Sequence, residues 1–133
     1  MKTLEEIIKT EAVFLHNWED KESVINDFEN LGWEKEEKKS EILKRYEGKN
    51  ILFASYGLGN YSGDAFVLFE ENGKLFEINA GHCSCYGLED QWTPEEVCLP
   101  ELEQRLTKGT FGTDSYSDNN FKAELIQFLG IKI

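Results

Sequence analysis

The residues best suited to chemistry lie in one short segment, residues 81–87, with the sequence Gly-His-Cys-Ser-Cys-Tyr-Gly. His82, Cys83 and Cys85 belong to the residue types that bind soft metal ions or act as nucleophiles. If the segment is extended, Cys83 and Cys85 point to one face and His82 points to the other. The pattern suggests a metal site or a thiol nucleophile, and the alternative is that the cysteines pack in the core.

A zinc site is the first hypothesis for this segment, and it needs four ligands in a tetrahedron. Cys83, Cys85, Cys98 and His16 are the candidates for that set. Structural zinc sites separate paired cysteines by two residues or more, whereas one residue separates Cys83 from Cys85 and no second pair exists. We therefore expect reduced, metal-free cysteines and no cofactor, with Cys83 and Cys85 at least partly buried, and zinc is kept as the alternative.

A thiol-dependent enzyme is the second hypothesis, because a cysteine nucleophile needs a base near its sulfur and a group that orients the base. Cys83 is the candidate nucleophile, His82 the base and Asp64 the orienting residue. Neighbouring residues on a strand point to opposite faces, so only a bulge or loop would bring Cys83 and His82 together. A non-enzymatic function is therefore favoured.

A glycine-rich stretch, residues 56–64, offers a third kind of site. A dinucleotide-binding loop is followed by a helix that receives the phosphates, whereas a strand is predicted here, so a long hairpin connection fits better. Tyr56, Tyr61 and Asp64 could line a small pocket beside the cysteine segment, with Trp92 closing it. Aromatic walls with a few polar groups are typical of ligand sites, and equally of small cores.

The charge of the chain is strongly negative, with 14 Lys and Arg against 26 Asp and Glu, a net charge of −12. Such a chain repels phosphate backbones and anionic lipid, so we expect no direct binding to nucleic acid or membranes. A partner with a basic surface is the natural complement, and Glu89, Asp90, Glu95 and Glu96 are its candidate contacts. No basic residue lies between Lys74 and Arg105, while seven carboxylates do: Glu77, Glu89, Asp90, Glu95, Glu96, Glu101 and Glu103. The alternative is a solubilising surface.

The scaffold for these residues is predicted to be a single α+β domain spanning residues 1–133. No signal peptide or membrane-length apolar segment is present, so we expect a cytoplasmic protein. Helical spacing of apolar residues predicts helices over 3–16, over 24–31 with Gly32 as its stop, and over 35–47.

After residue 49 the sequence changes from charge-rich to short apolar and aromatic runs, which predicts about three antiparallel strands within residues 50–79. Asn72-Gly73 stands between two apolar runs, which is a strong signal for a β-hairpin. Thr93-Pro94-Glu95-Glu96 has the pattern of a helix start, and the apolar stripe continues through Leu102 and Leu106 to Gly109. A last helix is predicted from a cap at Asp118 to a stop at Gly130.

Residues 61–96 resemble a family of small uncharacterised proteins associated with bacteriophages and prophages. The most specific parts are the motifs YSGDAFVLFE, NGKLFEI and HCSCYGLEDQW. The resemblance implies a protein in the cytoplasm of a host bacterium and transfers no catalytic residue. Together with the charge, it favours a protein that binds and modulates a host macromolecule by presenting a DNA-like negative surface to a basic partner.

Overall fold

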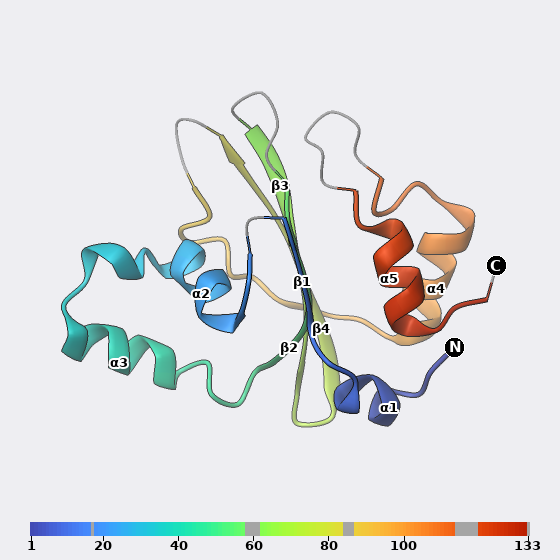
Figure 1. Ribbon diagram of the computed structural model, residues 1–133, viewed down its shortest axis with the longest axis horizontal. Coiled ribbons are helices and arrows are strands. Elements are labelled where there is room, and N and C mark those ends of the chain that lie inside the picture. The colour runs from blue at the N-terminus through green and yellow to red at the C-terminus, as the bar shows by residue number, and fades with distance from the viewer. Residues whose placement is uncertain (17, 58–61, 84–86, 114–119, 133) are drawn as a thin grey trace.

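A computed structural model of the protein describes residues 1–16, 18–57, 62–83, 87–113 and 120–132. The predicted α+β class is confirmed, since helices lie on both sides of a mixed sheet with the order β1-β2-β3-β4-β5 (Figure 1). The described strands are β1 (Val13–His16), β2 (Asn50–Tyr56), β3 (Ser62–Glu71), β4 (Lys74–Cys83) and β5 (Glu95–Glu96). The described helices are α1 (Leu4–Lys9), α2 (Lys21–Glu29), the short 3-10 helix η1 (Leu31–Trp33), α3 (Glu36–Lys44), α4 (Leu99–Lys108) and α5 (Lys122–Leu129).

The β3–β4 hairpin is the centre of the sheet. Its antiparallel register runs from Glu71 opposite Lys74 to Ser62 opposite Cys83. The turn residues Asn72 and Gly73 have φ angles of 54° and 78°, as a type I′ turn requires, which confirms the predicted hairpin.

The register divides the sheet residues between two apolar layers. On one face, which we call the α4/α5 face, Phe66 and Leu68 pack with residues of α1, α4 and α5. On the opposite face, which we call the α2 face, Ala65 and Val67 pack with Trp18 and residues of α2. Helix α3 packs outside α2 through a smaller apolar cluster. Both faces are therefore covered by helices, as Figure 1 shows with the sheet seen edge-on.

The N-terminal helix predicted over residues 3–16 is wrong in its second half. Helix α1 ends at Lys9, and Val13–His16 form β1, which pairs in parallel with β2. Val13 and Leu15 pack on the α4/α5 face while Phe14 packs on the α2 face. Strand alternation between two covered faces thus produces an apolar run that resembles a helix pattern.

The prediction of about three strands missed both edge strands. Glu95–Glu96, predicted to begin a helix, instead form β5 beside Phe76 and Glu77 of β4. Helix α4 begins at Leu99, and it places Pro100 in its first turn, where the missing amide proton costs nothing.

Two predicted helix ends also differ. Helix α2 ends at Glu29, and the residue that stops it is Asn30, in the left-handed conformation, rather than Gly32. The predicted cap Asp118 lies outside the described residues, and α5 begins at Lys122. Gly130 does end the last helix, with φ of 71°, as predicted.

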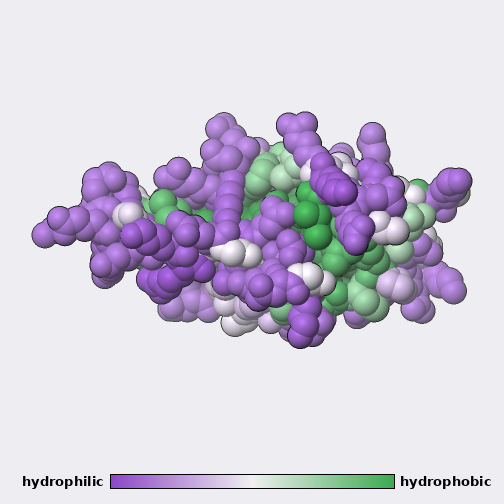
Figure 2. Space-filling model, turned by 90° about the horizontal axis from the view of Figure 1, so that it is seen from below, coloured by the Kyte–Doolittle hydropathy of each residue, from purple (hydrophilic) through white to green (hydrophobic). Residues whose placement is uncertain are grey.

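The surface seen from below is mostly hydrophilic, with apolar residues gathered near its middle between hydrophilic parts on either side (Figure 2). Met1 is the exposed large hydrophobic residue among those described. No described helix combines the length and apolarity needed to cross a membrane.

The turn can be tested with a matched pair of alanine variants. A Cβ at Gly73 or at Gly32 would meet no atom within 4 Å, but only Gly73 has positive φ, at 78°. Gly73→Ala should lower the free energy of unfolding by about 1 kcal/mol, because an L-residue resists the left-handed conformation. Urea unfolding should show no such loss for Gly32→Ala, and equal stability of the two variants would contradict the turn.

Candidate functional site

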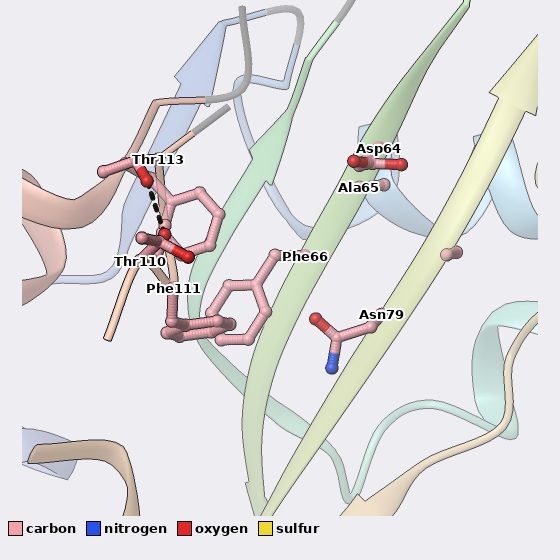
Figure 3. A pocket seen from close by; sticks show the side chains of 10 residues that line it. Asp64, Ala65, Phe66, Asn79, Thr110, Phe111 and Thr113 are labelled. Carbon is pink, nitrogen blue, oxygen red and sulfur yellow. Dashed lines mark hydrogen bonds between the residues drawn. The ribbon is translucent and has the colours of Figure 1, made fainter. Parts of the chain in front are cut away.

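A cleft of about 450 Å³ lies between the α4/α5 face of the hairpin and residues 110–113, which follow α4 (Figure 3). Strand β3 contributes Asp64 and Phe66, and β4 contributes Asn79. Thr110 and Phe111 approach from the other side. The cleft therefore combines a carboxylate, an amide and a hydroxyl with aromatic walls, a composition that ligand sites share.

Three phenylalanines form the apolar wall. Phe66 stacks on Phe121 with ring centroids 4.8 Å apart, and Phe111 meets both rings edge-on at 5.3 and 5.4 Å. Phe66 and Phe121 are buried, whereas Phe111 is half-buried. The wall is thus anchored in the core and presents Phe111 most openly to the cleft.

An ion pair between a buried carboxylate and a partly exposed guanidinium supports the floor of the cleft. Glu77 is only 5 % exposed and accepts hydrogen bonds from both Arg105 guanidinium NH₂ groups, at 3.0 Å for one of them. Arg105 reaches it from α4 and stacks at 4.5 Å on the ring of Phe111. The pair thus connects the sheet, α4 and the aromatic wall.

Glu77 also fixes the amide of Asn79, its neighbour on the same face of β4. Asn79 Nδ2 donates to Glu77 Oε1 at 2.7 Å. Both Glu77 carboxylate oxygens accept hydrogen bonds from Arg105, so the amide of Asn79 turns its donating nitrogen toward Glu77. The oxygen Oδ1 is then left on the cleft side, as Figure 3 shows.

Asp64 lies diagonally across the strand pair from Asn79. Its direct partner in the register is Gly81, two residues beyond Asn79 on β4. Diagonal neighbours on one face are about 7 to 8 Å apart at Cα, within reach of a single small ligand. The Asp64 side chain is exposed, whereas a Cβ at Gly81 would contact its carboxylate at 3.8 Å. Glycine at position 81 therefore keeps space beside the carboxylate.

The proposed Cys-His pair is not assembled. His82 is buried on the α2 face, where its Nε2 lies 2.7 Å from the carbonyl oxygen of Gly57 and its ring stacks on Tyr56 at 4.3 Å. Strand alternation places Cys83 and Asp64 on the opposite face. The structure therefore does not bring the His82 ring together with Cys83 or Asp64, as that hypothesis requires.

The proposed zinc ligands are also far apart. His16 lies on β1, three strand spacings or about 14 Å from β4, which carries Cys83. Cys98 follows Val97, whose amide donates to Leu75 at the opposite end of β4, about 26 Å from Cys83 at strand spacing. Cys85 lies outside the described residues, and among those described no three His, Cys, Asp or Glu side chains are grouped to hold a metal ion.

The described candidates for the predicted ligand pocket lie on both faces of the sheet. Of its candidates, Asp64 lines the cleft, whereas Tyr56 and Trp92 pack on the α2 face, and Tyr61 lies outside the described residues. Trp92 contacts the rings of Phe28, Tyr46 and Phe69 at 5.0 to 5.3 Å, which makes it a core residue.

Tyr56 is held in its neutral form. Burial, reinforced by the negative charges of Asp27 and Glu89, raises the pKa of the Tyr56 phenol above its usual value. It therefore contributes packing against Trp18 and His82 rather than a charge.

The candidate partner contacts are exposed, in two groups. Glu95 and Glu96 lie on the edge strand β5, and Glu89 and Asp90 lie in the connection that precedes it. Hydrogen bonds to its own backbone, to Asn30 and to Gly87 lower the pKa of Glu89 and keep it ionised. Glu77 was counted with these surface charges, but it is buried and neutralised by Arg105.

Gln91 is a structural residue that sequence analysis missed. Its side-chain amide accepts from the Gly81 amide at 2.9 Å and donates to the carbonyl oxygens of Gly81 and Gly87 at 2.7 and 2.8 Å. The Gln91 side chain thus forms hydrogen bonds to the backbone of β4 at Gly81, past the residues of β4 that pair with β5. It takes the place that a neighbouring strand would occupy there.

Asn79, Phe111 and Arg105 were missed as well. The hairpin register alone would have placed Asn79 on the face of Asp64, since Asn72-Gly73 fixes the pairing. No local signal in the sequence connects residues 110–113 with that face.

Comparison of the chain with protein-family models, with curated proteins and with solved structures finds no match. The resemblance to phage and prophage proteins therefore stays a prediction from the sequence, and the geometry of the cleft carries the functional argument.

The buried pair can be tested through stability. Arg105→Met should lower the free energy of unfolding by about 2 to 3 kcal/mol, since it leaves the Glu77 carboxylate buried and unpaired. The double variant Glu77→Gln, Arg105→Met should recover part of that loss. The control Lys108→Met, which removes an exposed charge from the same helix turn, should change the free energy of unfolding little. A double variant less stable than Arg105→Met alone in urea unfolding would contradict the role of the pair.

Proposed function

We propose that this protein is a small-ligand-binding domain whose site is the cleft between β3, β4 and residues 110–113. The observation that carries the proposal is the convergence of fixed polar groups beside an aromatic wall, in a cleft of about 450 Å³. That volume falls in the range of small-molecule sites, about 300 to 1,000 Å³. One of these polar groups, the amide of Asn79, is held in place by the ion pair of Glu77 and Arg105.

A binding role suits these residues better than a catalytic one. The groups that meet in the cleft are an aspartate, an asparagine and threonines, and the protein's described histidines, His16 and His82, lie elsewhere. Acid–base catalysis commonly pairs a nucleophile or base with an orienting partner. Here the oriented group is the amide of Asn79, which recognises a ligand by hydrogen bonds.

Blocking the cleft tests this proposal. Proton–nitrogen correlation NMR spectra of the protein with a library of small polar fragments should show binders that shift the amides of Asp64, Asn79 and Phe111. Thr110→Trp, which fills the cleft from an exposed position, should abolish those shifts. Thr93→Trp, also exposed but outside the cleft lining, is the control. Fragment binding that survives Thr110→Trp, or shifts confined to residues around Trp92, would place the site elsewhere.

We propose as a second function the binding of a basic host protein through the acidic edge, defined as Glu89, Asp90, Glu95 and Glu96. The observation that favours it is that all four carboxylates are exposed and lie on β5 or the connection before it. The predicted phage or prophage origin supports a host partner. Charges spread over an edge act mainly on the rate of encounter.

Salt and charge-neutral variants test the acidic edge. Replacing its four residues by Gln or Asn should weaken capture of a host protein from lysate at low salt. Added salt should reduce capture by the wild type, because charges more than about 10 Å apart are strongly screened at 0.1 M salt. The control is the variant with Glu11, Glu22, Glu41 and Glu47 changed to Gln, which alters the net charge equally at other exposed positions. Capture that is equal for both variants and insensitive to salt would contradict this function.

A further inference from the structure

We infer that the ligand of the cleft is a small organic cation that carries several N–H donors, of the amidinium, guanidinium or ammonium class. The inference rests on the proposed binding function of the cleft and names the chemistry of its occupant. It follows from the orientation of one amide, the sign of the charges around the cleft and the nature of its wall.

The floor of the cleft presents hydrogen-bond acceptors. Because Asn79 Nδ2 is bound to Glu77 Oε1 at 2.7 Å, its oxygen Oδ1 faces the cleft. The carboxylate of Asp64 lies diagonally beside it on the same face. A ligand that spans both residues must therefore donate hydrogen bonds to each, and a group with several N–H donors can do so at once.

The orientation of Asn79 is fixed by residues that do not touch the ligand. Arg105 donates to both carboxylate oxygens of Glu77, so both oxygens act as acceptors. Glu77 and Arg105 are thus positioning residues, and they determine that the cleft shows an amide oxygen rather than an amide nitrogen.

The charges around the cleft favour a cation. The positive charge of Arg105 is paired with Glu77, and Lys122, next to the wall residue Phe121, turns its ammonium group to the carbonyl oxygen of Gly109 at 3.1 Å. Asp64 adds a negative charge to the lining. With a net charge of −12 on the chain, the field attracts cations and repels anions.

The wall suits a cation as well. The Arg105 guanidinium already stacks on Phe111 at 4.5 Å, so a ring of this wall holds a planar cation within the protein itself. Aromatic rings attract cations through their negative faces, which adds to the hydrogen bonds of the floor.

The same cationic group can arrive as a free small molecule or as a basic side chain of a peptide. The shared chemistry is the N–H-donating cation. Butylguanidinium and an arginine residue blocked at both ends carry the same guanidinium and the same single charge, so comparing their affinities separates the two sources. Tighter binding of butylguanidinium identifies a free cation, and tighter binding of the blocked residue identifies a peptide side chain.

Benzamidine, benzamide and benzoate provide a matched set of probes, because they share one ring and differ in charge and in donors. Titration followed by NMR should show benzamidine at the amides of Asp64, Asn79 and Phe111, with affinity at least about tenfold above that of benzamide, since charge-assisted hydrogen bonds are the stronger class. Benzoate should not bind. Benzamide or benzoate bound in the cleft as tightly as benzamidine would overturn the inference and leave the binding function standing. Binding of none of the three, together with no fragment from the library, would overturn both.

Variants separate direct contact from positioning. Asp64→Asn should lower the affinity for benzamidine by at least about tenfold and leave the affinity for benzamide nearly unchanged. The control is Glu41→Gln, an equal charge change at an exposed position of α3, which should alter neither affinity. Glu77→Gln lets Asn79 turn its nitrogen to the cleft, so the ratio of benzamidine to benzamide affinity should fall. A parallel loss for both probes would mean that Glu77 is merely structural. If Glu77→Gln fails to fold, the Asp64→Asn ratio decides the inference, and an unchanged ratio overturns it.

Discussion

The register of the β3–β4 hairpin is the constraint on which the rest of the structure depends. Side chains alternate between faces, so a slip of one residue would move every side chain of a strand to the other side. The observed pairing puts Asp64, Phe66, Glu77 and Asn79 on the α4/α5 face and His82 on the α2 face. The turn at Asn72-Gly73 sets this pairing, and the positive φ values of both residues are what a two-residue connection demands.

The ion pair between the buried Glu77 and Arg105 organises the residues that this register brings to one face into a candidate site. Taking the Glu77 carboxylate out of water is costly, and an ion pair with a buried member is weak evidence for stability by itself. Here the cost is offset by several contacts at once, since Glu77 also accepts from Asn79 and Arg105 also stacks on Phe111. The pair joins the sheet to α4 and to the aromatic wall, and it gives the Asn79 amide a single orientation.

Much of the fold follows from patterns that act over short distances. The hairpin, the α+β class and the stop at Gly130 were predicted because turn chemistry and apolar spacing are local. The strand β1 was not, since three apolar residues that alternate between two covered faces look like part of a helix. The strand β5 was not, because Thr93-Pro94-Glu95-Glu96 matches a helix start and only pairing with β4 overrides it.

The site was harder to predict than the fold. Residue types directed attention to His82, Cys83 and Trp92, but alternation and aromatic packing place His82 and Trp92 on the face away from the cleft. Asp64 was identified, although with the wrong neighbours. Phe111 and Arg105 come from segments far along the chain, and a local pattern carries no information about such contacts. The pairing of Arg105 with Glu77 also explains why a count of carboxylates overstates the acidic surface.

Contacts between protein and bound benzamidine test the central claim most directly, because they show both where the cation lies and which groups surround it. Intermolecular nuclear Overhauser effects should connect the benzamidine ring protons with the ring of Phe111 and with the side chain of Asn79. Effects to Trp92, Tyr56 or other residues of the α2 face, with none to Phe111 or Asn79, would contradict the account.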